Sequence, residues 1–328
     1  MKRITLCALL MTLFLLLSCG SGSAKAENSK TTFLTSIANL GKGFLDVFTS
    51  LSDMITGAFG VKAETKKSEV GAYFTKIADT MTSVKAKLND VVATNGNYPK
   101  LKTVVEHFIT NTLDKIAEGA KTAATGTAGD DKIGSAPKEG QDAVTADTTS
   151  VNALVKAIKT IVDVVLKDGE GNEKSDKTID SDKKKIGQLF AKKDDGAQDT
   201  EESKASASIG AVTGADILQA IAVAKRDDNK KEIKENQKDA IIAGGIALRA
   251  MAKGGKFAAK QDASDKYANA VNGVAANAVG KTLSPLIIAI RNTVDNGLKS
   301  ISEALAAVKQ EDKSAEATPA DATASGQQ

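Results

Sequence analysis

The chain has 328 residues, of which 41% are hydrophobic and 26% are charged, and its formal net charge at neutral pH is only +3. A chain of this length can bury a large core, and its near-neutral charge argues against a nucleic-acid-binding surface. Aromatic residues make up only 4% of the chain and tryptophan is absent, a composition that favours helices joined by polar loops.

The N-terminus has the pattern of an export signal. Lys2 and Arg3 form a short basic start, and residues 4–17 contain no charged side chain. The apolar run is shorter than the roughly 20 residues that a membrane-spanning helix needs. The pattern therefore predicts a cleaved signal peptide over residues 1–18, with an uncleaved signal anchor as the alternative.

The residues around the predicted cleavage site resemble the lipobox of bacterial lipoproteins. Leu16 stands at position −3, the small residue Ser18 stands at −1, and Cys19 follows directly. A cysteine thiolate is the nucleophile that diacylglyceryl attachment requires, and the resemblance implies that Cys19 becomes the lipidated first residue. Because Cys7 leaves with the signal, the mature chain keeps no thiol for a disulfide or a thiolate metal site.

The first part of the mature chain predicts a tether and three helices. Residues 19–30 are rich in Gly, Ser and charged residues and should form a flexible tether. Apolar residues spaced three and four apart predict amphipathic helices over 31–59 and 70–91. Residues 95–97 should end the second helix, and a proline at the start of 99–116 should begin the third.

The middle of the chain alternates polar segments with shorter helices. Residues 119–147 have almost no large apolar side chains and are predicted to form a long loop or to be partly disordered. Helices are predicted at 151–166, 183–192 and 216–225, and polar loops are predicted at 168–182, 193–208 and 226–235.

Residues 238–253 predict a helix that is apolar over most of its circumference and rich in Ala and Gly. Such a helix belongs in the interior of a protein, so we expect residues 241–257 to be structural and largely buried. A weaker helix is expected at 266–279. Ser284 as N-cap and Pro285 as the first helical residue should then begin a long C-terminal helix.

Every seventh position of this C-terminal helix is apolar: Ile287, Val294, Ile301 and Val308. A seam of this kind packs on another long helix, and the N-terminal helix is the expected partner. The chain shows no alternating strand pattern. The predicted fold is therefore all-α, an elongated helical bundle with its long N- and C-terminal helices packed together and polar loops at the membrane-distal end. Residues 31–308 should form one helical domain, and residues 309–328 a disordered tail.

No cluster of residues predicts catalysis or metal binding. His107 is the only histidine and has no His or Cys companions, which favours a flanking or packing role over general-base catalysis. The acidic pair Asp130-Asp131 lacks the spacing of a calcium loop. Residues 254–256 and 280–282 each miss a glycine of the P-loop and follow no predicted strand. We therefore expect no catalytic, cofactor-binding or metal-binding residues.

One segment carries a family resemblance. Residues 238–257, KDAIIAGGIALRAMAKGGKF, are similar to the invariable segment of the variable large proteins of relapsing-fever Borrelia and of the related antigen VlsE. That segment has the form A-x-x-L-R-G-M-A-K-x-G-x-F-A, and Ala250 replaces its glycine here. The lipobox and the stretches 31–92 and 286–308 also fit the family, so the resemblance covers nearly the whole mature chain.

The resemblance implies a non-enzymatic surface antigen, held by its Cys19 lipid on the extracellular face of the outer membrane. Members of the family are exchanged by recombination, so that host antibodies lose their target. Hydrophilic loops without packing duties suit such a role because they tolerate substitution.

An adhesin or receptor for a host glycosaminoglycan or serum protein is the alternative function. The lysine run 183–185 could attract a polyanion, although its acidic neighbours favour a mixed, solvated surface. The helix seams could also serve a homodimer. Neither interpretation involves nucleic acid.

Overall fold

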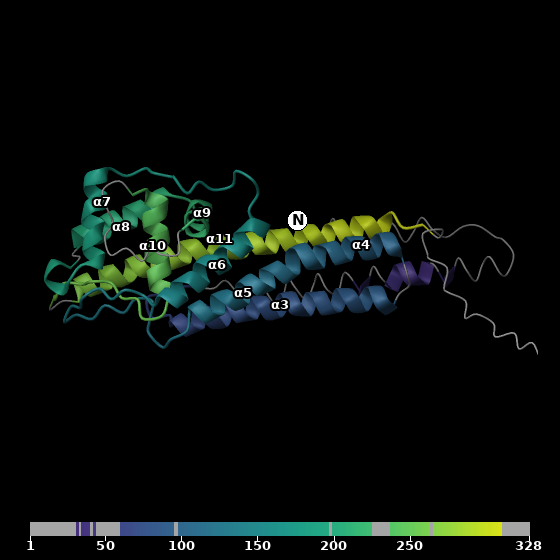
Figure 1. Cartoon of the computed structure of the whole chain (residues 1–328), viewed down its shortest axis with the longest axis horizontal. Helices are drawn as coiled ribbons and strands as arrows, with labels where there is room; N and C mark the ends of the chain where they lie inside the picture. The colour runs from purple at the N-terminus through teal and green to yellow at the C-terminus, as the bar shows by residue number, and fades with distance from the viewer. Residues whose placement is uncertain are drawn as a thin grey trace, which may run out of the picture. The chain divides into compact units, whose positions relative to one another are not determined.

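The computed structural model describes residues 31–32, 34–39, 42–43, 60–94, 98–196, 199–224, 237–262 and 265–309 (Figure 1). Helices supply the regular structure of these residues, which contain no β-strand and only isolated bridges. The all-α prediction is therefore confirmed.

Two compact units divide the chain. The first takes in Met1–Phe48, Ala86–His107 and Leu298–Gln328, and the second takes in Thr49–Lys85 and Phe108–Gly297. Several predictions fall outside the described residues: the signal and tether, most of the helix at 31–59, the break at 95–97, the loop at 226–235 and the tail from 310. The described parts of 31–43 are helical, and in the first unit Gly43 lies against the side chain of Val91.

The helices predicted from 70 to 116 are confirmed. Helix α3 spans Lys67–Thr94, and a continuous helical stretch follows through α4 (Pro99–Phe108), a π-helical turn (Ile109–Leu113) and α5 (Asp114–Gly126). The buried residues of α3 recur every three or four positions, as a core-facing helix requires: Val70, Phe74, Ile77, Met81, Val84 and Leu88.

The loop predicted at 119–147 is wrong in its first part, because α5 continues to Gly126. Small residues let α5 lie close against α6 (Thr148–Val165), where a Cβ at Gly119 would stand 2.6 Å from Cγ1 of Ile161. Close backbone approach thus replaces the large apolar side chains that this stretch lacks. Beyond the helix, three more apolar side chains of the segment are buried: Ile133, Ala136 and Ala146.

Helix α6 matches the helix predicted at 151–166. Its N-cap is Asp147, whose carboxylate accepts hydrogen bonds from the backbone N–H and the hydroxyl of Ser150. This cap satisfies a backbone donor that has no partner inside the helix, and so fixes where the preceding segment ends.

The loop predicted at 193–208 is also wrong in its larger part. Helix α7 (Asp180–Ile186) is followed by two 3-10 turns and by α8 (Asp199–Ala211). Ala205, Ser208 and Ile209 are buried on one side of α8. Pattern analysis missed α8 because its buried side chains are mostly small or polar.

Helices α9 (Gly214–Ala222) and α10 (Asp239–Met251) confirm the helices predicted at 216–225 and 238–253. Helix α10 packs on both α8 and α9, and the three lie together in Figure 1. As predicted, residues 241–257 are largely buried, although Ile241, Gly245 and Lys253 are exposed.

The two helices predicted around Ser284 are in fact one, α11 (Lys266–Ala306), with Pro285 inside it. An internal proline removes the hydrogen bond to the carbonyl four residues earlier, here that of Lys281. Gly214 of α9 lies directly against this turn, since a Cβ there would stand 2.2 Å from Cγ of Pro285. Tertiary packing therefore keeps the helix continuous where local propensity predicted its start.

The apolar stripe of α11 has three- and four-residue spacing: Leu283, Leu286, Ile290, Val294, Leu298, Ile301 and Leu305 are buried. Ile287 and Val308 of the predicted heptad seam are only partly buried. By length and composition α11 could cross a membrane, but a buried stripe of this kind is equally that of a core helix.

Substitution of Gly126 by alanine tests the close α5–α6 contact. Its Cβ would stand 2.7 Å from the carbonyl oxygen of Ser150 and 2.9 Å from Cγ of Leu154. We expect Gly126→Ala to lower the free energy of unfolding by about 1–3 kcal/mol, measured by urea denaturation. Gly273→Ala is the matched control in α11, where a Cβ meets nothing within 4 Å, and it should stabilise by about 0.5–1 kcal/mol. Equal gains from both substitutions would contradict the contact.

Candidate functional site

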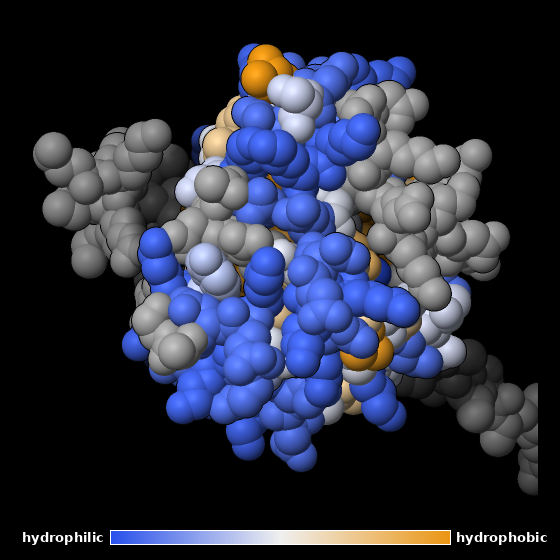
Figure 2. Space-filling model, turned by 90° about the vertical axis from the view of Figure 1, so that its left-hand side faces the viewer, coloured by the Kyte–Doolittle hydropathy of each residue, from blue (hydrophilic) through white to orange (hydrophobic). Residues whose placement is uncertain are grey.

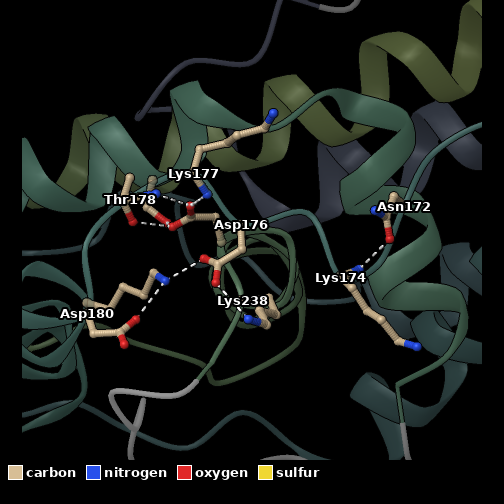
Figure 3. Close-up of polar contacts among 10 residues, drawn as sticks. Asn172, Lys174, Asp176, Lys177, Thr178, Asp180 and Lys238 are labelled. Atoms are coloured by element: carbon tan, nitrogen blue, oxygen red, sulfur yellow. Dashed lines mark hydrogen bonds and ion pairs between the residues drawn. The ribbon is translucent and has the colours of Figure 1, made fainter.

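A buried carboxylate at the N-terminus of α10 joins three segments of the second unit (Figure 3). Asp239 is fully buried and accepts hydrogen bonds from the backbone N–H groups of Lys177 and Thr178, at 2.6 and 2.7 Å. The hydroxyl groups of Thr178 and Ser208 also donate to it, at 2.5 and 2.6 Å. One side chain therefore ties α10 to α8 and to the segment that precedes α7.

Ion pairs extend this cluster. The ammonium of Lys183 on α7 is buried and donates to the carboxylates of Asp176 and Asp180. Lys238 donates to the other oxygen of Asp176, at 2.8 Å. The prediction that the lysine run 183–185 forms a solvated surface is thus wrong for Lys183, which is an internal tie.

Hydrogen bonds decide the ionisation of this cluster. Burial alone raises the pKa of Asp239, but hydrogen bonds from Ser208, Thr178 and the Lys177 backbone outweigh it and hold the pKa below its usual range. Burial likewise opposes charge on Lys183, yet its bonds to Asp176 and Asp180 leave its pKa raised. The surroundings therefore favour the charged forms of both Asp239 and Lys183.

The opposite end of α10 is held by an ammonium group. Lys67, the first residue of α3, is fully buried and donates to the carbonyl oxygens of Ala252 and Gly255, at 2.6 and 2.8 Å, with that of Arg249 at 3.4 Å. The last carbonyls of a helix have no partner inside it and favour a positive charge. Burial lowers the pKa of Lys67 to about 8.

The segment after α10 is held on both sides. Its backbone pairs with that of the earlier polar segment at two bridges, Gln141–Ala259 and Val144–Lys256. The guanidinium of Arg249 lies over the ring of Phe190, 4.4 Å from its centroid, a cation–π contact. Residues 241–257 are thus held by Lys67, by the backbone at Val144 and by the ring of Phe190.

Sequence reasoning did not predict either end of this arrangement. Asp239 stands in the first turn of a helix, where a carboxylate is favourable, and this was the one available signal. No such signal marks Lys67, because it lies in a Lys-rich stretch whose composition is typical of a solvated surface. The partners of Asp239 and Lys67 lie between 31 and 188 residues away in the sequence, so only the fold identifies them.

The other candidate residues are not brought together. His107 is exposed on α4, Asp130 and Asp131 are exposed, and residues 280–282 lie inside α11. Within the described ranges, no group of three or more His, Cys, Asp or Glu side chains is placed to hold a metal ion. Cys19 lies outside those ranges.

The face on which α7 lies is mostly hydrophilic, with isolated apolar residues (Figure 2). The segment between α6 and α7 is partly exposed, since residues 167–170 are exposed and Ile179 is 65% exposed. The buried side of this segment is held by the Asp239 cluster, which comprises Asp176, Lys183, Lys238, Asp239 and their partners. The segment is therefore exposed on one side and held by hydrogen bonds and ion pairs on the other.

Known proteins resemble this chain over its whole length. A family model described as Borrelia lipoprotein matches residues 44–305. Variable large protein 4 of Borrelia hermsii is 58% identical over 98% of both chains, and variable large protein 17 of the same organism is 57% identical over 100% of this chain and 99% of its own.

A solved structure shares the fold. It is the crystal structure of the Lyme disease variable surface antigen VlsE of Borrelia burgdorferi, which is 30% identical in sequence. The TM-score is 0.71, and the match covers 83% of this chain and 98% of that chain. The likeness therefore extends through nearly all of that solved chain.

Replacement of Asp239 tests whether the cluster holds the molecule together. Asp239→Asn keeps the side-chain volume but removes the charge that accepts four hydrogen bonds, and we expect a loss of about 2–4 kcal/mol in the free energy of unfolding. The control is Asp163→Asn, which breaks the exposed Lys159–Asp163 pair at 3.0 Å and should change stability by less than about 1 kcal/mol. A loss no larger than that of the control would show that the cluster is dispensable.

The pH dependence of stability tests the environment of Lys67. Its pKa of about 8 in the folded chain lies below the ordinary 10.5, so between these values the unfolded chain binds more protons. The stability contributed by Lys67 therefore rises with pH over this window. We expect the free energy of unfolding of the wild type, measured by urea denaturation, to increase relative to that of Lys67→Met between about pH 7 and about pH 10. A constant difference would mean that burial does not disfavour the ammonium.

Proposed function

This chain belongs to the Borrelia lipoprotein family and is a variable surface antigen like its relatives, and we propose that a lipid on Cys19 displays it on the outer membrane. In this proposal residues 1–18 are removed during export, and residues 19–30 tether the helical domain of 31–308 to the lipid. More than one acyl chain is needed for stable anchoring, which is consistent with acylation of both the thiol and the new amine.

The proposed partners are the outer membrane and host antibodies, and the proposed role is non-enzymatic. The observation that carries this proposal is the contrast within the segment 167–180. Residues 167–169 and Ile179 are exposed, whereas Thr178 and Asp176 bind Asp239 and Lys183. Exposed side chains that make no such contacts are free to change in sequence.

An adhesin would need a concentrated basic or apolar surface. The large apolar side chains that the described residues expose are single positions on different segments: Val144, Ile179, Val223, Ile241 and Ile288. Lys183, the first lysine of the predicted basic run, is buried in ion pairs. These observations favour the antigen over the adhesin. A homodimer stays a prediction from the helix seams.

Separate replacement of the two cysteines tests the anchor. In cells fed labelled palmitate, we expect the wild type and Cys7→Ala to incorporate label and Cys19→Ala to incorporate none, because only Cys19 follows the cleavage site. Protease added to intact cells should degrade the wild type and Cys7→Ala chains. Palmitate on Cys19→Ala would refute the lipidation site, whereas labelled wild-type protein that resists the protease until the cells are lysed would refute surface display.

A further inference from the structure

The guanidinium of Arg249 is buried without a counter-charge. The residue is only 7% exposed, and its side chain stacks on Phe190. Among the residues that the structure describes, this side chain has neither an ion pair nor a hydrogen bond. Arginine is almost never buried in this way unless it is paired. By contrast, Arg291 on α11 lies 3.9 Å from the carboxylate of Asp295.

The nitrogen atoms of Arg249 still reach solvent. Fully buried nitrogen and oxygen atoms without a hydrogen-bond partner occur among the described residues, but none belongs to Arg249. Its N–H donors therefore keep some contact with solvent. A guanidinium presents these donors as a planar fork that matches the oxygens of an oxyanion.

Further positive charge lies around the same turn. The Lys67 ammonium bonds to the carbonyl of Arg249 itself, and Lys256 and Arg249 both lie close enough to lower the pKa of Lys67 further after burial has done so. Burial also lowers the pKa of Arg249, to about 10. The carboxylate of Asp131 opposes this lowering of the Lys67 pKa, but among the described residues it forms no ion pair with Arg249.

The glycine-rich turn after α10 brings these groups together. A Cβ at Gly255 would stand 2.3 Å from the carbonyl oxygen of Arg249 and 3.1 Å from its Cγ, so only glycine lets the chain lie against the arginine stem. Residues 254–256 fail as a P-loop in the sequence and follow a helix here rather than a strand. The turn is therefore not a nucleotide site, but it packs directly against the stem of the Arg249 side chain.

We propose that Arg249 binds a small inorganic oxyanion of the phosphate or sulfate class at the C-terminal end of α10. Because the side chain is only 7% exposed, the sulfate groups of a bulky polymer are not expected to reach it. A bound anion would supply the counter-charge that the described side chains do not, and would brace the turn that Lys67 holds from the other side. Because this site lies on the core helix, it is independent of lipid anchoring and of antibody binding.

Equilibrium dialysis of the full-length lipoprotein in detergent against labelled inorganic phosphate tests the site. We expect saturable binding of one phosphate per chain to the wild type, with affinity reduced at least about tenfold in Arg249→Met, since a charge-assisted pair of hydrogen bonds is lost. Arg291→Met is the matched control and should bind like the wild type. Equal binding by wild type and Arg249→Met, or no saturable binding to the wild type, would overturn the proposal.

Circular dichroism shows whether Arg249→Met folds. If it does not, two further measurements test the site: displacement of labelled phosphate by other anions, and phosphate binding by the more conservative variant Arg249→Lys. Sulfate should displace labelled phosphate from the wild type, while chloride at the same ionic strength and heparin should not. Arg249→Lys retains the charge without the fork, so it should bind more weakly than the wild type. Displacement by heparin, or unchanged binding in Arg249→Lys, would contradict a small site built around the guanidinium.

Discussion

Helix α10 is held at both ends by buried charges that come from distant parts of the chain. At its N-terminus the Asp239 carboxylate gathers the segment before α7 and the side of α8. At its C-terminus the Lys67 ammonium satisfies the last carbonyls. Both charges have the sign that the helix dipole favours at their end. Because each would be costly to bury unpaired, the core helix and its surrounding segments order together.

A second lysine repeats this arrangement. Lys281 of α11 donates to the carbonyl oxygens of Ile209 and Gly210 at the end of α8, at 2.8 and 3.0 Å. Long helices thus supply hydrogen-bond donors to the C-terminal ends of α8 and α10. These two ends therefore do not depend on the segments that follow them for hydrogen bonds, so those segments can differ in sequence. A surface antigen that varies needs this independence.

Periodicity of large apolar residues predicted α3, α4, α6, α9, α10 and the all-α class. It failed at α8 and at the end of α5, where residues such as Gly119 and Ala205 are buried through close backbone approach rather than side-chain bulk. It failed at Pro285 because Gly214 supports the helix from outside. At the candidate site the sequence identified α10 as buried but not its ties, since a buried Lys67 and a solvated lysine look alike until the partners are known.

The tie between Lys67 and α10 spans 182 to 188 residues of sequence. Substitutions at exposed positions between its two ends leave both ends in place. A change at either end breaks the tie, because it needs both the Lys67 ammonium and the carbonyls of residues 252 and 255. Two positions far apart in the chain must therefore be kept together, whereas exposed residues between them need not be.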